Sequence, residues 1–375
     1  TPAVYESAES TYNAVAYDTA NKKLLIAYRD NGNSGYGTAV VATLSGTTLT
    51  YGTPTVYYSG GGDDITVVYS TVAGKFVISW NASGGRSIVA TVSGDSVSFG
   101  SENNWSTNGL DYTVSAYDSG NDKVVVAYGD GSQSDYGYSR VGTISGTSIS
   151  FGTEAQFIAN VVLQIGLTYD STSGKTIVVY GNSTTALGRA QVGTVSGTDI
   201  TWGSATTYGA NEVGRVNRAA HDVSQDKIFV AYRESTDVYG IIGTVSGTSI
   251  SFGTRVSLMT SSAEIHQAVT YHAAAEKIVF SGQKSDNVLT AIICTISGTT
   301  FSQTSPITLD SNGTFNQQSG YDSTEEQVVV AYKAVSNSNY GTAVTITPAY
   351  TATNLTASNL LGIASAAIAD TETGT

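Results

Sequence analysis

The chain has 375 residues, of which only 13% are charged, and its 17 basic and 30 acidic side chains give a formal net charge of −13. Such a chain lacks the surplus of Lys and Arg that binds a nucleic-acid backbone or an anionic membrane surface, so we expect neither partner. No run of about 18 apolar residues is present, which argues against membrane insertion. The many Gly, Ser, Thr and Tyr residues favour strands and turns over helices.

A repeat of about fifty residues organises the chain from its beginning. Its first element is a Tyr-Asp pair or a close variant of it. The copies are Tyr17-Asp18, Tyr69-Ser70, Tyr117-Asp118, Tyr169-Asp170, His221-Asp222, Tyr271-His272 and Tyr321-Asp322. Soon after each pair a Lys, or Gln327 in the last copy, starts an apolar run, and a Ser-Gly pair such as Ser45-Gly46 follows in every copy but the last.

Each copy predicts four strands in chain order. The first, strand A, ends at the Tyr-Asp pair, and Asp suits the turn that follows because its side chain can bond the backbone two residues on. Strand B is the apolar run, which is apolar on both faces and is therefore expected to be buried on both sides. Strand C ends at the Ser-Gly pair, where Gly supplies the positive φ of a tight hairpin. Strand D alternates and carries an aromatic residue.

Seven such copies predict an all-β fold, a seven-bladed β-propeller of four-stranded antiparallel blades over residues 1–350. The last copy lacks a clear strand D, and residues 2–7 match residues 54–59 of the first strand D, so we expect the N-terminal strand to close the last blade. The expected blades cover approximately residues 9–60, 61–109, 110–160, 161–211, 212–262, 263–312, and 313–349 with 1–8. Residues 351–375 are expected to be a C-terminal extension or a linker to a further module.

The candidate binding residues lie where the copies differ. The A–B turns and Ser-Gly hairpins vary little, whereas the B–C and D–A loops vary in length and chemistry, which marks one face as the place for a ligand. Drift in unconstrained loops would give the same pattern. At that face the A strands begin around the central channel, and they carry Tyr12, Asn13, Tyr112, Asn217, Arg218, His266, Gln267 and Gln317. These polar and aromatic side chains suit a sugar-like ligand, although any wet channel mouth must be polar.

Trp105 is a further candidate, because it stands in a loop rich in Gly, Asn and Ser. As an exposed aromatic it would stack on a sugar face; alternatively it caps the blade below it.

The motifs of enzymes are missing from the sequence. There is no HExxH, cysteine cluster or GxSxG, so we expect no catalytic residue and no metal site. His221 and His272 occupy repeat positions and are interpreted as turn or packing variants, and the repeated Asp is one turn residue rather than a catalytic pair. Cys294 lies in an apolar run and is expected in the core. No cofactor is expected; residues 30–35 and 130–135 only faintly resemble a calcium loop, which leaves calcium as an alternative.

The repeat, from Tyr-Asp through Lys and its apolar run to Ser-Gly-Thr-x-Ile-Ser-Phe-Gly, resembles propeller repeats in structural and tail-fibre-like proteins of aquatic bacteriophages, notably cyanophages. The resemblance covers about residues 1–350 and implies a role on a virion surface or in host recognition; it carries no catalytic residue. We therefore expect a non-enzymatic extracellular or virion-surface module that binds cell-surface glycan and belongs to a larger assembly. The alternatives are a purely structural fibre or filament subunit whose C-terminal extension docks on a neighbouring subunit, and a glycan-cleaving hydrolase.

Overall fold

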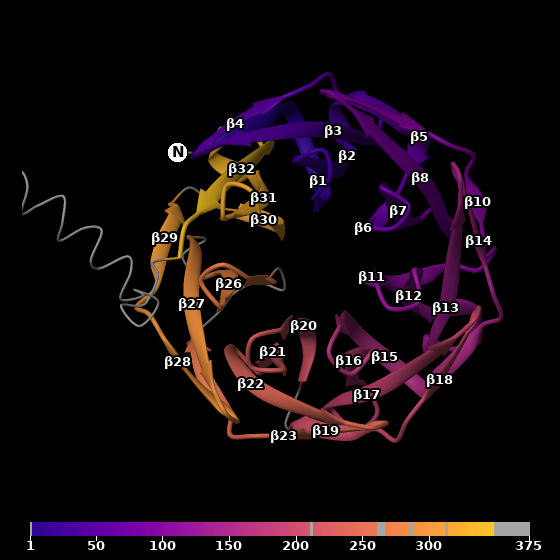
Figure 1. Ribbon diagram of the computed structural model, residues 1–375, viewed down its shortest axis with the longest axis vertical. Helices are drawn as coiled ribbons and strands as arrows, with labels where there is room; N and C mark the ends of the chain where they lie inside the picture. The colour runs from indigo at the N-terminus through magenta and orange to yellow at the C-terminus, as the bar shows by residue number, and fades with distance from the viewer. Residues whose placement is uncertain (1, 211–212, 261–266, 285–287, 312–313, 349–375) are drawn as a thin grey trace, which may run out of the picture.

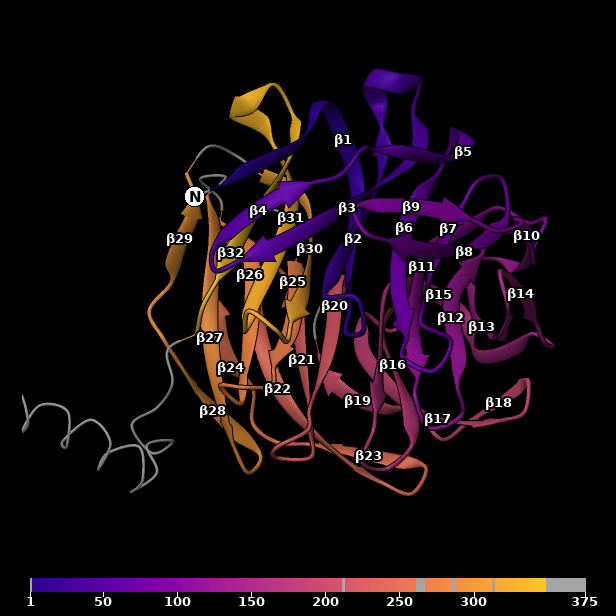
Figure 2. The same ribbon diagram turned by 45° about the horizontal axis from the view of Figure 1, so that its top comes forward.

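The computed structural model describes residues 2–210, 213–260, 267–284, 288–311 and 314–348. These residues form antiparallel β-strands joined by turns, which confirms the all-β class. The helical elements among them are three short 3-10 turns, η1 (Asn31–Asn33), η2 (Gly131–Gln133) and η3 (Val335–Asn337). The repeat units stand side by side in a ring, with the A strands nearest its centre (Figures 1 and 2).

Each repeat unit has three long strands, A, B and C, and an outer D strand made of short pieces. The A strands are β1 (Ala3–Asp18), β6 (Asp63–Ser70), β11 (Leu110–Asp118), β15 (Ala155–Asp170), β20 (Val213–Asp222), β25 (Gln267–His272) and β30 (Thr314–Asp322). The B strands are β2 (Lys23–Asp30), β7 (Lys75–Asn81), β12 (Lys123–Asp130), β16 (Lys175–Asn182), β21 (Lys227–Glu234), β26 (Lys277–Gln283) and β31 (Gln327–Ala334).

The outer strands follow the same order. The C strands are β3 (Tyr36–Ser45), β8 (Gly85–Ser93), β13 (Tyr136–Ser145), β17 (Leu187–Ser196), β22 (Asp237–Ser246), β27 (Leu289–Ser297) and β32 (Tyr340–Ile346). The D pieces are β4 (Thr48–Tyr51), β5 (Thr55–Gly61), β9 (Ser96–Phe99), β10 (Asn103–Asn104), β14 (Ser148–Phe151), β18 (Asp199–Trp202), β19 (Thr206–Gly209), β23 (Ser249–Phe252), β24 (Val256–Met259), β28 (Thr300–Gln303) and β29 (Ile307–Asp310). Strands β1 and β15 each begin as a D piece of the preceding unit and continue as an A strand. We name each unit by its A strand.

The turns are built as the sequence predicts. At the A–B turn of the β1 unit, Asp18 Oδ1 accepts hydrogen bonds from the backbone N–H groups of Ala20 (2.8 Å) and Asn21 (2.9 Å). In two units the turn Asp is replaced, and the replacing side chain accepts an equivalent hydrogen bond. Ser70 Oγ accepts from Ala73 N (2.9 Å), and His272 Nδ1 accepts from Ala275 N (3.0 Å). The interpretation of His272 as a turn variant is thus confirmed.

The B strands form the core. Residues 24–28 of β2 are completely buried, as are the equivalent runs of β12 and β31. Each B strand lies between its own A and C strands and is covered on its two faces by the neighbouring units, so both faces can be apolar. Cys294 is likewise fully buried in the core, as predicted.

Aromatic pairs join neighbouring units. A ring on the second D piece of one unit packs against the aromatic residue near the end of the next B strand, as for Tyr57 and Trp80, whose ring centroids are 5.0 Å apart, and Phe157 and Tyr180, at 5.2 Å. A glycine of the C strand leaves room for the D-strand ring: a Cβ on Gly137 would lie 2.4 Å from Phe157. The glycine of this C strand is therefore needed for the packing between units.

The N-terminal segment takes part in the last unit. The first residues of β1 pair antiparallel with β32, with Ala3 opposite Ala343 and Val4 opposite Thr342, as the sequence match to residues 54–59 predicts. Tyr5 then packs on Tyr28 of the β1 unit with ring centroids 5.3 Å apart. Contacts between A strands run from β1 through β6, β11, β15, β20, β25 and β30 back to β1. The predicted extension, residues 351–375, lies outside the described residues.

Candidate functional site

One backbone irregularity recurs in the A strands. Six residues before the Asp of the A–B turn, or the residue that replaces it, the strand bulges against its B strand, as between Thr11 and Ala14 in β1 and between Asp111 and Val114 in β11. The residue at this position has a left-handed backbone, which is uncommon for any residue other than glycine. These bulge residues are Tyr12 (φ 53°), Asp64 (φ 50°), Tyr112 (φ 58°), Gln164 (φ 42°) and Asn316 (φ 56°).

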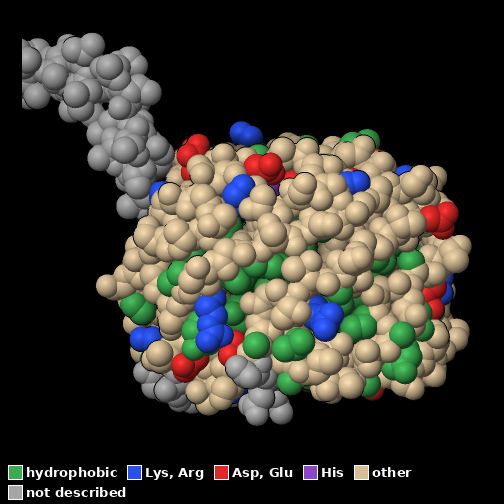
Figure 3. Space-filling model, turned by 90° about the horizontal axis from the view of Figure 1, so that it is seen from below, with side chains coloured by type: hydrophobic (Ala, Val, Ile, Leu, Met, Phe, Trp, Pro, Cys, Tyr) green, Lys and Arg blue, Asp and Glu red, His purple; other side chains and the backbone are tan. Residues whose placement is uncertain are grey.

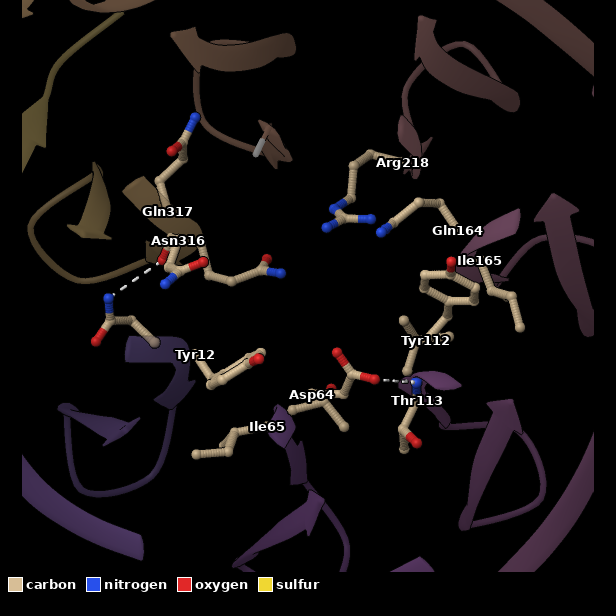
Figure 4. A pocket seen from close by; sticks show the side chains of 14 residues that line it. Tyr12, Asp64, Ile65, Tyr112, Thr113, Gln164, Ile165, Arg218, Asn316 and Gln317 are labelled. Atoms are coloured by element: carbon tan, nitrogen blue, oxygen red, sulfur yellow. Dashed lines mark hydrogen bonds between the residues drawn. The ribbon is translucent and has the colours of Figure 1, made fainter. Parts of the chain in front are cut away.

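The bulges surround a central cavity. Its volume is about 650 Å³ including the part open to solvent, and its lining comes from the A strands β1, β6, β11, β15, β20 and β30. Figure 4 shows the side chains of Tyr12, Asp64, Tyr112, Gln164 and Arg218 directed toward the middle of this opening. The bulge position thus presents tyrosine, aspartate, glutamine or asparagine, according to the unit, to one shared space.

The carboxyl group of Asp64 is the acidic group of the described lining. Thr113 N donates to its Oδ2 at 3.4 Å. Burial raises the pKa of Asp64 to about 6; the backbone N–H groups of Tyr112 and Thr113 oppose this shift, and the nearby Asp111 and Asp63 add to it. A carboxyl group whose pKa is raised in this way costs stability at neutral pH, so the fold alone does not explain its presence.

Arg218 of β20 supplies a positive charge to the cavity. Its Nε donates to the backbone oxygen of Gln267 (3.0 Å) and one terminal nitrogen donates to that of Asn217 (3.0 Å). Burial lowers the pKa of Arg218, and the charge of Asp64 opposes this shift. In the other units the same repeat position holds Ala14, Thr66, Val114, Gly166, Ala268 and Gln318.

Two tyrosines lie on either side of Asp64. Tyr12 comes from the unit before it and Tyr112 from the unit after it, and both project into the cavity (Figure 4). Burial raises the pKa of Tyr12, and Asp63 and Asp64 raise it further. The cavity therefore has an aromatic and acidic side around Asp64 and a basic side at Arg218.

Several predicted residues do line this cavity. Tyr12, Asn13, Tyr112, Arg218 and Gln317 are brought together there, as the sequence predicts. The asparagines, however, have structural partners. Tyr5 Oη donates to Asn13 Oδ1 (2.8 Å), and Asn13 Nδ2 donates to the backbone oxygen of Asn316 (3.2 Å).

Asn217 occupies the same repeat position as Asn13 and bonds in the same manner. Tyr208 Oη donates to its Oδ1, its Nδ2 donates to the backbone oxygen of Gln164 (2.9 Å), and its side chain is fully buried. Gln267 is also buried and does not line the cavity. His266 lies outside the described residues.

The expectation that Trp105 is an exposed stacking residue is wrong. Its indole is 7% exposed, packs against Tyr128 (ring centroids 5.0 Å apart) and donates from Nε1 to Ser87 Oγ (3.0 Å). Trp105 holds the position that Tyr57 and Phe157 hold in their units, which is the aromatic pair between units. The alternative prediction, that Trp105 packs within the propeller, agrees with the structure.

The sequence prediction missed nine lining residues, and four of them carry a carboxyl or amide group: Asp64, Gln164, Asn316 and Gln318. The signal was available, because each stands four or six residues before the repeated turn residue. The spacing from the turn residue identifies these four positions in the sequence, whereas the type of side chain alone does not.

One group of possible metal ligands occurs within the described ranges: Asp170, His221 and Asp226. His221 Nε2 lies 3.2 Å from Asp170 Oδ1 and 3.5 Å from Asp226 Oδ1. Asp170 Oδ1 already accepts the N–H groups of Thr172 and Ser173, and Ser171 N–H points at His221 Nδ1 (3.3 Å), which leaves the ring hydrogen on Nε2. The group is a contact between two units, as expected for a packing variant.

The two segments with a faint calcium-loop pattern use their first carboxylates as caps. Asp30 Oδ1 accepts from Asn33 N (3.0 Å) at the start of η1, and Asp130 Oδ1 accepts from Ser132 N (2.9 Å) at the start of η2. These bonds explain the recurrence of Asp at both places.

No family model and no curated protein matches the sequence. Several solved structures resemble the fold. BP39L lectin from Burkholderia pseudomallei is 10% identical, with a TM-score of 0.69, and the match covers 92% of this chain and 98% of that one. A mutant of AofleA from Arthrobotrys oligospora is 10% identical, with a TM-score of 0.52 and coverage of 82% and 92%. A protein from Lactobacillus plantarum is 10% identical, with a TM-score of 0.58 and coverage of 80% and 85%.

At such low identity these likenesses concern the fold alone. Together with the ring of antiparallel units they place the chain in the β-propeller class. Among the described residues, no helix is long and apolar enough to cross a bilayer.

Proposed function

We propose that this chain is a non-enzymatic, seven-bladed propeller that binds carbohydrate in its central cavity. Support for the blade count comes from the seven sequence copies, from the A-strand contacts that return to β1, and from the pairing of the N-terminal segment with β32. Support for carbohydrate comes from the likeness to a lectin over nearly the whole chain. An extracellular or virion-surface setting belongs to the proposal and rests on the resemblance of the repeat to phage proteins.

The observation that carries the proposal is the ring of bulges. A left-handed backbone is strained for residues other than glycine, asparagine and aspartate, and Tyr12, Tyr112 and Gln164 adopt it where they face the cavity. The side chains it presents are tyrosine rings, amides and a carboxyl group, with a guanidinium from β20. Sugars are bound by such sets, because ring faces pack on aromatic side chains and hydroxyl groups exchange hydrogen bonds with planar polar groups.

A binding role is favoured over hydrolysis by the acid content of the cavity. Asp64 is the one carboxylate among its described lining residues, whereas glycoside hydrolysis generally uses two carboxylates that flank the scissile bond. The hydrolase alternative predicts that incubation with a bound glycan shortens it, and mass spectrometry of the recovered glycan would reveal this.

A glycan array followed by calorimetric titration of the best glycan tests the proposal. Tyr112→Asn removes a ring from the cavity while keeping a residue that tolerates the left-handed backbone, as Asn316 does at the same repeat position. We expect this variant to bind at least tenfold more weakly. The matched control is Val72→Thr, a change on an exposed A–B turn outside the cavity, which should leave affinity unchanged. Equal affinity for both variants and the parent chain would refute the cavity as the site.

A further inference from the structure

The charges of the cavity lie apart on opposite walls. Asp64 projects from β6 and Arg218 from β20, and Figure 4 shows the carboxyl and guanidinium groups facing each other across the opening. They influence each other electrostatically, yet neither takes part in an ion pair within the described part of the chain. Two opposite charges kept apart in a partly desolvated space favour a ligand that carries both signs.

The acidic wall is suited to an ammonium group. Asp64 lies between Tyr12 and Tyr112, so a cation placed against the carboxylate is close to two aromatic rings. Cations are attracted to the faces of aromatic rings, and quaternary ammonium groups are recognised by such aromatic surroundings. A neutral hydroxyl group would hydrogen-bond to Asp64 but would leave its charge uncompensated.

The opposite wall is suited to an anion. The Arg218 guanidinium is held by the backbone oxygens of Gln267 and Asn217, which fix its plane without neutralising its charge. A guanidinium fixed in this way favours carboxylate or phosphate oxygens over hydroxyls. Gln164 lies next to it in the lining and adds an amide from the adjacent unit.

We propose that the central cavity binds a zwitterionic group, with its ammonium between Tyr12, Asp64 and Tyr112 and its carboxylate or phosphate at Arg218. The group is either a small molecule or a substituent on a glycan. This inference rests on the proposed function, because it concerns the same cavity and names what that cavity selects. A zwitterion adds no net charge, so the formal −13 of the chain does not oppose its approach.

Binding is expected to depend on pH through Asp64. The charged and titratable groups around it are Asp63 on its own strand, which is paired with Arg29 (2.6 Å), Asp111 and Tyr112 on β11, Tyr12 on β1 and Arg218 across the cavity. Because the pKa of Asp64 lies near 6, the ionised form that an ammonium needs prevails above that pH and is lost below it. Affinity for the zwitterion should therefore fall as the pH drops from 7 to 5.

The test is calorimetric titration of the full chain with chosen probes. Glycerophosphocholine and glycine betaine carry both charges, choline carries the cation alone, acetate and inorganic phosphate carry the anion alone, and methyl glucoside is neutral. We expect at least one zwitterion to bind tenfold or more tightly than each single-charge probe and than methyl glucoside. The two zwitterions distinguish phosphate from carboxylate as the anion.

Variants assign each wall. Asp64→Asn keeps a residue that tolerates the left-handed backbone and should weaken zwitterion binding about tenfold while abolishing its pH dependence. Arg218→Gln should weaken it similarly, and Arg218→Lys, which keeps the charge, should retain more binding. Thermal melts show which variants are folded, and Arg218→Lys keeps the test usable where Arg218→Gln is not.

The outcomes separate this inference from the proposed function. If array glycans bind with dependence on Tyr112 but the zwitterions bind no better than choline, acetate or methyl glucoside, the zwitterion assignment is overturned and carbohydrate binding stands. If neither glycans nor probes bind, both fail. If the zwitterions bind but Asp64→Asn leaves the affinity unchanged at pH 7 and pH 5, the assignment of the acidic wall is wrong.

Discussion

Two positions of the repeat differ in what recurs from unit to unit: the side-chain type at the packing between units, and the backbone conformation at the bulges of the A strands. Between units, one position is always large and apolar: it is leucine in two units, Leu258 and Leu309, and an aromatic residue that packs on the next B strand in the other five, namely Tyr5, Tyr57, Trp105, Phe157 and Tyr208. At the bulges of β1, β6, β11, β15 and β30 the backbone is left-handed at the same repeat position, but the side chains are tyrosine, aspartate, glutamine and asparagine. The position whose side chains stay large and apolar holds neighbouring units together. The bulge position keeps its backbone but varies its side chain, so it can present different chemical groups to a ligand in the cavity.

The largest effect is expected at the joint between the two ends of the ring. Removal of residues 1–8 takes away the pairing with β32 and the Tyr5 ring. The loss should exceed about 3–5 kcal/mol, which is the usual cost of truncating one buried aromatic residue to alanine. Thermal and urea melts measure it, with Tyr5→Ala as the smaller companion change. An unchanged melting temperature would contradict the role of the N-terminal strand.

A glycine of the C strand comes next. Gly137→Ala places a Cβ 2.4 Å from the Phe157 ring, so the aromatic pair between units must shift. Overpacking of this kind costs about 1–3 kcal/mol. Gly109→Ala is the matched control, because its Cβ would have no atom within 4 Å and its φ is not left-handed. Equal urea midpoints for the two variants would contradict the packing argument.

Substitution of the bulge residue Asp64 should raise the stability of the fold, whereas the two preceding changes lower it. The pKa of Asp64 is about 6 in the folded chain, above its unfolded value, so the folded state binds this proton more tightly and the destabilising contribution of Asp64 disappears as the pH falls from about 7 to 4. Asp64→Asn should therefore be more stable than the wild type at pH 7 by at most about 2 kcal/mol, since the carboxyl group is partly exposed. Urea melts at pH 7 and pH 4.5 check this, and the advantage should shrink at the lower pH. A variant less stable at pH 7 would show that Asp64 serves the fold.

The smallest effect is expected at a turn. Asp118 Oδ1 accepts the N–H groups of Gly120 (3.0 Å) and Asn121 (3.0 Å), so Asp118→Ala should cost about 1 kcal/mol in a urea melt. Asp118→Ser should recover part of this loss, because Ser70 caps the equivalent turn. Loss of ligand binding in Asp118→Ala with normal stability would place function at the turns instead.

The repeat made most of the fold predictable, because each unit is defined by local turn chemistry and by an apolar run. Strand order, the Asp-capped turns, the Ser-Gly hairpins and the use of residues 2–7 beside β32 all follow from matched positions. Trp105 was misplaced because its unit is shorter and its neighbours are polar, so composition suggested a loop where register places an aromatic pair. That Asp64 and Arg218 line one cavity could not be predicted from their sequence positions, because their units lie far apart in the sequence and come together only around the centre of the ring.

Hydrogen exchange with and without the best array glycan is the sharpest test of carbohydrate binding in the central cavity, since it maps the ligand without any substitution. The glycan should slow exchange of the bulge segments around Tyr12, Asp64, Tyr112 and Gln164 and leave the A–B turns unchanged. Protection confined to the B–C loops or the outer D strands, with the bulge segments unaffected, would contradict this prediction.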